Sequence, residues 1–161
     1  MPEVIKTYRQ KISGALRFIG KKYSSGREAW KNWDNDNKDN ILEKHINGIN
    51  KGLFDDSEYI IGFMCESNGN FEYWLGYFTP ENTPVPEGFE CIDLPKMDLG
   101  VGWIYGKDSE VYAKEKLVWH ALAKEGYKII TGYFFERYVY NRCEVPDDNG
   151  NIIIDICFFV E

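Results

Sequence analysis

The sequence lacks the long apolar runs that would insert it into a membrane or send it through one. No uninterrupted hydrophobic stretch approaches the roughly 20 residues that a transmembrane helix needs. Residues 1–6 include a proline, a glutamate and a lysine, so they do not form the apolar segment of a secretory signal. We therefore expect a cytoplasmic protein with no membrane partner.

Metal-binding and nucleophile motifs are also missing. None of the four cysteines belongs to a Cys-x-x-Cys pair, and the two histidines have no partner at ligand spacing. The acidic run at residues 34–39 has Asp39 at the position where a calcium loop requires glycine. No Gly-x-Ser-x-Gly motif is present. The sequence thus predicts reduced thiols, no metal and no cofactor.

Positive charge is in short supply. The chain has 19 lysines and arginines against 26 aspartates and glutamates, which gives a net charge of -7. Nucleic-acid binding needs basic residues clustered against phosphates, so we expect no direct DNA binding. A negative charge attracts cationic ligands, although it also serves solubility alone.

Aromatic residues, by contrast, are abundant. They make up 16% of a chain that is 43% hydrophobic, with 5 Trp, 11 Tyr and 10 Phe. A single core of a 161-residue domain does not need so many rings. We expect some of them to line a surface or a pocket.

The chain repeats a short pattern. Asn-Gly turns at residues 67–70 and 148–151 lie 81 residues apart, each between strand-like runs. Two candidate helix caps, Ser25 and Ser109, lie 84 residues apart. Two landmarks with nearly the same offset indicate a duplicated module within one domain, with halves at about 1–80 and 87–161 and a proline-rich linker between them.

Each half reads as strand, helix, strand, strand. The first half has an extended segment at 7–23, a helix from Ser25 that breaks at 34–40 and resumes to about 49, and strands at 59–65 and 71–78. The second has an extended segment at 89–105, a helix capped by Asp108 or Ser109 and ended by Gly126, and strands at 133–143 and 152–160. The fold class predicted is α+β: a duplicated β-α-β-β module that forms a curved antiparallel sheet, with two main helices on one face and a ligand groove between the halves.

A two-residue turn at 149–150 predicts the pairing of the last two strands. It places Tyr140 opposite Phe159 and Arg142 opposite Cys157. The apolar side chains at 152, 154, 156 and 158 then meet the helices, and the other face, which carries Asp155, is aromatic and polar. If the halves join edge to edge, the aromatic faces line one concave surface. Its expected residues are Glu136, Tyr138 and Tyr140 in the second half and Phe63 and Trp74 in the first.

Glu136 is the candidate site residue, because it is a carboxylate in a stretch dominated by aromatic rings. Such a carboxylate can bind an organic cation together with the rings, or act as a general acid or base. It can equally form a salt bridge with a neighbouring arginine or lysine. Trp74, Trp103, Tyr105 and Tyr138 are candidate ring walls, with plain core packing as the alternative.

Three segments resemble the GyrI-like effector-binding domains: 88–95, 134–138 (Phe-Phe-Glu-Arg-Tyr) and 146–160. These domains are the ligand-sensing modules of AraC-type and MerR-type multidrug-responsive regulators, and stand-alone versions include gyrase-inhibitory proteins. The resemblance covers most of the chain and is clearest after Pro86. The regulators carry a helix-turn-helix domain before this module, whereas residues 1–23 here read as strand, which again argues against direct DNA binding.

The resemblance implies a bacterial stand-alone module that binds lipophilic, often cationic, molecules in a central groove. Glu136 matches the glutamate that meets the positive charge, and Tyr138 matches the tyrosine that follows it. The full set of expected ligand-binding residues is Glu136, Tyr138, Trp103, Tyr105, Trp74, Phe63 and Tyr140. Some relatives hydrolyse small electrophilic compounds, so a hydrolase that uses Glu136 and Tyr138 stays open, as does a gyrase-inhibitor-like protein that acts on a protein partner.

Overall fold

The protein is built from eight strands and four α-helices, described here from a computed structural model of residues 1–161. The strands are β1 (Glu3–Gln10), β2 (Leu16–Tyr23), β3 (Ile61–Ser67), β4 (Asn70–Pro80), β5 (Glu90–Leu94), β6 (Asp98–Gly106), β7 (Ile129–Arg137) and β8 (Ile152–Val160). The helices are α1 (Gly26–Asp36), α2 (Ile41–Ile46), α3 (Glu115–Lys124) and α4 (Tyr140–Cys143), with a 3₁₀ turn at Lys38–Asn40. None of these helices is long and apolar enough to cross a membrane.

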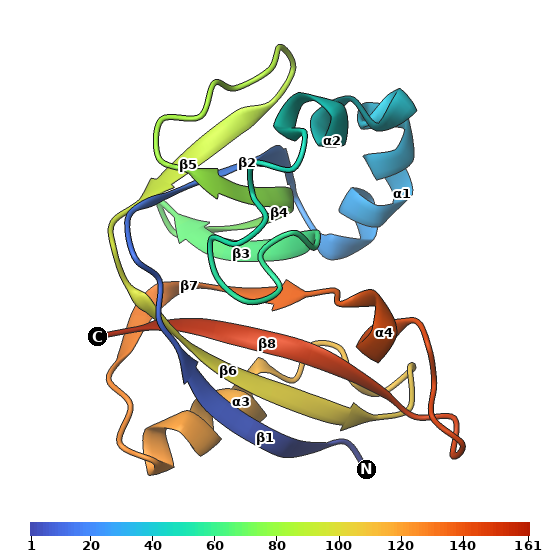
Figure 1. Ribbon diagram of the computed structural model, residues 1–161. Coiled ribbons are helices and arrows are strands. Elements are labelled where there is room, and N and C mark those ends of the chain that lie inside the picture. Colours follow the sequence, from blue (N-terminus) through green and yellow to red (C-terminus); the bar gives the residue numbers. More distant parts are fainter.

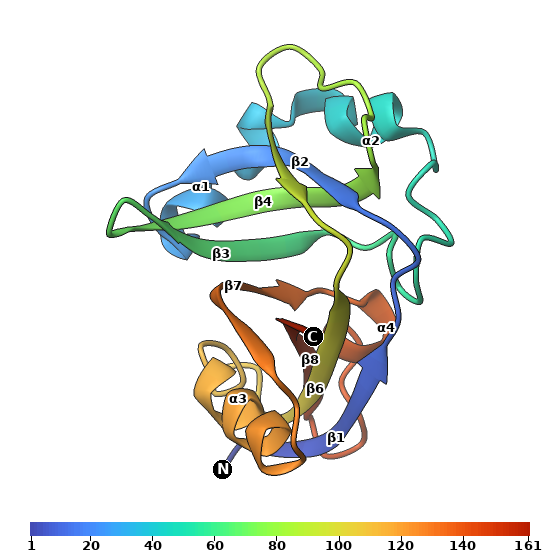
Figure 2. The same cartoon turned by 90° about the vertical axis from the view of Figure 1, so that its left-hand side faces the viewer.

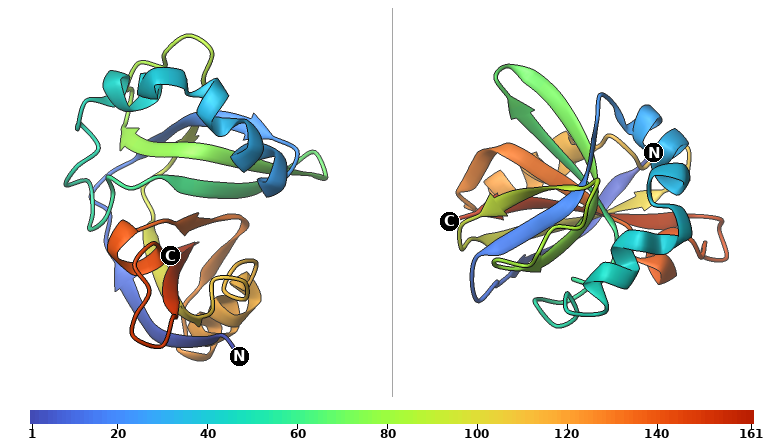
Figure 3. Two further views of the ribbon diagram at one scale, coloured as in Figure 1. Left: turned by 90° about the vertical axis from the view of Figure 1, so that its right-hand side faces the viewer. Right: turned by 90° about the horizontal axis from the view of Figure 1, so that it is seen from above.

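All eight strands belong to one antiparallel sheet, in the order β1-β6-β8-β7-β3-β4-β2-β5. The sheet is curved, with α1 and α2 over its upper strands and α3 beside its lower ones (Figures 1 and 3). The two groups of strands meet edge to edge, where β3 pairs with β7. The α+β class and the curved antiparallel sheet expected from the sequence are therefore confirmed.

The two groups exchange a strand. The expected extended segments at 7–23 and 89–105 are each two strands, interrupted at 11–15 and 95–97. After these interruptions the chain crosses to the other group: β1 pairs with β6, and β5 pairs with β2 (Figure 2). The predicted halves, about 1–80 and 87–161, thus each supply one strand to the sheet of the other.

The first hairpin and the first helix begin as the sequence predicts. Ser67 pairs with Asn70 across a two-residue turn, and Asn68 and Gly69 both have positive φ, at 54° and 79°. The Ser25 side chain accepts a hydrogen bond from the backbone N–H of Glu28 at 3.2 Å, which satisfies one of the free donors of the first helical turn.

The predicted second hairpin is wrong. β7 ends at Arg137, and the chain then forms α4 and a local turn that the Asp147 carboxylate holds by accepting the N–H groups of Asn149 and Asn151. Phe135 rather than Arg142 lies opposite Cys157, seven positions earlier than predicted. Because seven is odd, the side chains of residues 134–137 lie on the opposite face from the one expected.

The second helix also starts later than predicted. Asp108 and Ser109 do not cap it, since α3 begins at Glu115 and the chain before it is interrupted at Ala113, which has a φ of 59°. Val111 is nevertheless fully buried, in the same core as the helix. Gly102 lets α3 lie directly on β6, because a Cβ at that position would meet Val118 at 2.5 Å.

The two faces of the sheet bury different side chains. The inner face, which carries Phe63, Trp74, Phe135 and Phe159, closes on itself and forms the largest apolar core. The helix face carries alternate residues, which pack under α3 or under α1 and α2. The concave aromatic surface expected from the sequence is thus a filled core.

Candidate functional site

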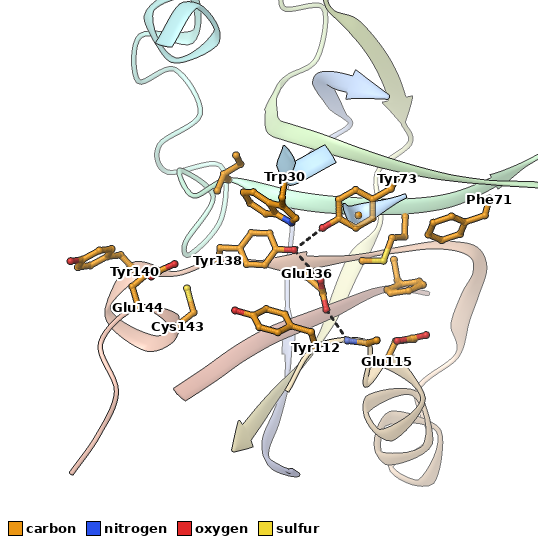
Figure 4. Close-up of a pocket in the computed structure, with 15 residues that line it drawn as sticks. Trp30, Phe71, Tyr73, Tyr112, Glu115, Glu136, Tyr138, Tyr140, Cys143 and Glu144 are labelled. Atoms are coloured by element: carbon orange, nitrogen blue, oxygen red, sulfur yellow. Dashed lines mark hydrogen bonds between the residues drawn. The ribbon is translucent and has the colours of Figure 1, made fainter. Parts of the chain in front are cut away.

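A pocket of about 960 Å³ lies on the helix face, where β3 and β7 join the two groups of strands. Trp30 of α1 lines it from above, Glu115 of α3 from below and Tyr140 and Cys143 of α4 from one side (Figure 4). Its charged lining residues are all carboxylates, with no lysine or arginine among them: Glu115, Glu136 and Glu144. Its aromatic lining residues are Trp30, Phe71, Tyr73, Tyr112, Phe134, Tyr138 and Tyr140.

Glu136 lies in this pocket and is buried, with 7% of its surface exposed. The Tyr138 hydroxyl donates a hydrogen bond to one carboxylate oxygen at 2.9 Å, and the backbone N–H of Ala113 reaches the other at 3.4 Å (Figure 4). No ion pair of the protein includes Glu136. The salt bridge considered as the alternative role for this residue is therefore not formed.

The neighbouring side chain does form a complete ionic network, on the inner face. Arg137 donates two hydrogen bonds to Asp155, at 3.0 and 2.9 Å, and a third to Gln10 at 3.1 Å. Arg142, from α4, donates to Asp155 and to Asp56. Arg137 and Arg142, the two arginines that follow Glu136 in the sequence, are thus both paired on the inner face, and neither forms an ion pair with Glu136.

A chain of hydroxyl groups supports Glu136. The Tyr73 and Tyr138 oxygens lie 2.9 Å apart, and the ring of Tyr138 meets Trp30 edge to face, with centroids 5.2 Å apart. Gly62 faces both hydroxyls from β3, directly opposite Glu136 in the strand pairing. A Cβ at Gly62 would lie 2.3 Å from the Tyr73 oxygen and 2.7 Å from the Tyr138 oxygen, so only glycine leaves room for this pair.

Burial raises the pKa of Glu136, because removal from water disfavours the charged form. The hydrogen bonds from Tyr138 and Ala113 lower it in part, and the nearby Glu115 raises it further. Burial and the charge of Glu136 together raise the pKa of Tyr138 well above its usual value. Tyr138 therefore stays protonated and remains a hydrogen-bond donor.

Ala113 holds its backbone in a strained conformation beside the site. A φ of 59° is unusual for a residue with a Cβ and costs about 1–3 kcal/mol. This conformation turns the backbone just before α3 begins and directs the Ala113 N–H towards Glu136. Strain of this kind tends to persist at functional sites, where the surrounding structure imposes it.

The pocket brings together three of the seven residues expected to bind a ligand: Glu136, Tyr138 and Tyr140. Phe63 and Trp74 lie in the core of the inner face. Trp103, also on that side, is flanked by Arg142 and Lys6, whose charged groups lie 4.4 and 4.6 Å from its ring centroid. The Tyr105 hydroxyl donates to the Asp147 carboxylate, outside the pocket.

The same error in register explains why the pocket residues on β3, β4 and β7 were missed. Tyr73 and Phe134 lie opposite Met64 from either side, so all three share the face of Glu136. Trp30 left no such signal in the sequence. It lies three residues before Trp33, a spacing that places both rings on the same side of a helix, yet Trp33 is buried and Trp30 is 46% exposed.

No protein-family model and no curated protein sequence matches the chain. Solved structures do match it over nearly its full length. One is SAV2435 bound to tetraphenylphosphonium, with 18% identity, 98% of this chain and 94% of that chain covered, and a TM-score of 0.61.

Two others match in the same way. A protein of Staphylococcus aureus MU50, assigned provisionally to bacterial transcription regulation, has 20% identity, coverage of 97% and 98%, and a TM-score of 0.57. A hydrolase from Listeria innocua has 10% identity, coverage of 97% and 92%, and a TM-score of 0.58. At these identities the likeness concerns the fold, and the chain has the fold that its resemblance to the GyrI-like effector-binding domains implied.

Proposed function

We propose that the protein binds small amphipathic organic cations in this pocket, with Glu136 as the counter-charge. The observation that carries the proposal is a buried carboxylate with hydrogen-bond donors but no cationic partner. A buried charge without an opposite charge is costly, and a bound cation would remove part of that cost. The missing partner is thus supplied by the ligand.

The rest of the pocket suits such a ligand. Its volume of about 960 Å³ falls in the range of small-molecule sites, and seven of its 15 lining residues are aromatic. Rings attract a cation through their faces and bury its apolar substituents. Glu115 and Glu144 add negative charge, so an anion of the same shape would be repelled.

The structural neighbours support this choice of ligand class and of role. SAV2435, with which the chain shares its fold, was solved with the lipophilic cation tetraphenylphosphonium. The S. aureus neighbour is assigned to transcription regulation. We extend the proposal accordingly to a ligand-sensing protein whose bound state is read by the transcription or drug-response machinery.

A pair of ions with one shape and opposite charges tests the proposal. Calorimetry should show binding of tetraphenylphosphonium and none of tetraphenylborate. Glu136→Gln should weaken phosphonium binding by about tenfold to a hundredfold, as expected for loss of a contact worth roughly 1.5–3 kcal/mol. Glu87→Gln, an exposed residue outside the pocket, removes the same charge and should leave the affinity within about twofold.

Two results would contradict the proposal. Equal affinity for the borate would show that shape alone decides binding. Unchanged phosphonium affinity in Glu136→Gln would show that the carboxylate does not meet the charge.

A hydrolase is the second candidate, favoured by the pairing of Glu136 with Tyr138 and by the fold shared with the Listeria hydrolase. With an epoxide as substrate, Glu136 would take a proton from an attacking water and Tyr138 would protonate the departing oxygen. The proton on Glu136 would then return to Tyr138 through their hydrogen bond. The raised pKa of Tyr138 makes it a weak acid, which places this candidate second.

Turnover decides between the two candidates. Epoxide opening that is lost in both Glu136→Gln and Tyr138→Phe would establish the hydrolase. No turnover across a panel of epoxides and activated esters, with cation binding intact, would leave the binding protein.

A further inference from the structure

A second hollow of about 290 Å³ adjoins the pocket. Met64, Phe71 and Phe134 line both spaces. Phe71 lies at one end of the main pocket and Tyr140 at the other, with Glu136 between them (Figure 4). The second hollow therefore continues the pocket beyond its Phe71 end.

An irregularity in β7 creates this extension. The pairing of β7 with β8 shifts between Ile129 and Phe134, and the pairing with β3 ends at Tyr133. Residues 130–132 are consequently free of both neighbouring strands, and Gly132 has a φ of 106° that few other residues adopt. The sheet opens here, and the exposed residues of β7 form one wall of the hollow.

α3 borders both spaces, with a carboxylate facing the main pocket and an aromatic ring facing the extension. Glu115 lines the main pocket, and Trp119, one helical turn later, lines the extension. The polar side chains of the extension are few: Glu66 and Thr131 are exposed, the Cys65 thiol contacts Glu72, and the Tyr133 hydroxyl donates to the Met97 sulfur. The rings of Trp119 and Phe71 are 40% and 52% exposed, with apolar surface that no part of the chain covers.

We propose that the ligand is elongated, with a cationic head beside Glu136 and an unbranched apolar tail that passes Phe134 and ends under Trp119. The head rests on the proposed function, whereas the tail rests only on the extension. Glu136 and Gly132 are four residues apart on β7, a span of roughly 13 Å at the usual rise of a strand. The preferred class is a single organic cation with one long alkyl arm, whereas a compact cation such as tetraphenylphosphonium would occupy only the part of the pocket beside Glu136.

An alkyltrimethylammonium series with butyl, octyl and dodecyl chains tests the tail. Each methylene that enters the extension should raise the affinity by up to about fourfold, so octyl should bind at least on the order of tenfold tighter than butyl. Trp119→Ala should remove most of this gain and leave butyl binding within about twofold. Trp119→Phe keeps a ring in place and should retain the gain.

Leu117→Ala provides the matched control. Leu117 lies on the same helix, is 41% exposed, and lines neither the pocket nor the extension, so its loss should not change the chain-length dependence. An octyl gain that is the same in Trp119→Ala, Leu117→Ala and the unaltered protein would overturn the proposal, since the tail would then contact surface elsewhere. Melting curves recorded first show that each variant is folded.

The same titrations separate the tail from the head. If Glu136→Gln leaves butyl binding unchanged while Trp119→Ala removes the octyl gain, the charge partner is wrong and the tail site stands. If Glu136→Gln weakens every member of the series equally and Trp119→Ala changes none, the head stands and the elongated ligand is rejected.

Discussion

Glu136 and Arg137 are neighbours on one strand, yet the protein treats their charges in opposite ways. Arg137 is 1% exposed and reaches Asp155, Gln10, Tyr8 and the carbonyl of Asp55. Glu136 is almost as deeply buried and has two donors but no cation. Since strand residues alternate between faces, Arg137 lies in a fully paired ionic network on the inner face and Glu136 lies on the helix face without a cation.

This contrast shows how one strand serves stability and binding at once. On the inner face, two arginines share Asp155, and Asp56 from the loop before β3 joins them, so the network ties the two groups of strands together. On the helix face, where β3 pairs with β7, the Glu136 carboxylate lines the pocket without a cationic partner. Breaking the first site should cost stability, and altering the second should change binding.

Asp155→Asn should produce the largest effect on stability. It leaves Arg137 and Arg142 without their shared carboxylate in the interior, and loss of one member of a buried ion pair costs about 3–5 kcal/mol. Urea unfolding should show this loss directly. Asp93→Asn removes an exposed carboxylate that pairs with Arg17 and should cost about 0–1 kcal/mol. Equal costs for the two variants would show that the buried network on the inner face contributes no more stability than an exposed ion pair.

Binding of tetraphenylphosphonium should weaken in acid. The pKa of Glu136 is raised by burial, so the carboxylate takes up a proton at a higher pH than an ordinary glutamate and then no longer attracts a cation. Affinity should be constant at higher pH and fall by about tenfold per pH unit below that pKa. The Glu136→Gln variant should show no such dependence, and a parallel fall in both proteins would assign it to another group.

The smallest expected effect is that of Glu136→Gln on the unfolding free energy of the unliganded protein. A raised pKa means that the folded state holds the proton more tightly than the unfolded chain, so stability declines as pH rises from the ordinary glutamate value through the raised one. The neutral amide avoids this decline, and its unfolding free energy above that window should match or exceed that of the unaltered protein. A loss as large as that of Asp155→Asn would make Glu136 a structural residue.

Two local signals in the first half of the sequence predicted local structure correctly. The cap at Ser25 and the turn at residues 68–69 depend on atoms within a few positions, and both form as expected. The α+β class followed from the order of the elements. The choice of Glu136 depended on a carboxylate among rings, and that residue does lie unpaired in the pocket.

The face on which the site lies could not be predicted in this way. It depends on the register of β7 against β8, which was predicted from a two-residue turn at residues 149–150. Those residues close a local turn instead, because α4 and the Asp147 turn take up the chain between the strands. The odd shift in the register of β7 places Glu136 on the opposite face from the one predicted. Phe63 and Trp74 were therefore expected beside Glu136, although both lie in the core of the other face.

The exchanged strands have a consequence for synthesis. Gln10 of β1 pairs with Leu99 of β6, 89 residues later, so the first strand to leave the ribosome waits for more than half of the chain before its partner exists. Contacts so distant in sequence slow folding and leave the early strand edge unpaired in the meantime. β1 carries Lys6 and Arg9 among its exposed residues, and charges of this kind protect an unpaired strand from joining the wrong partner during that interval.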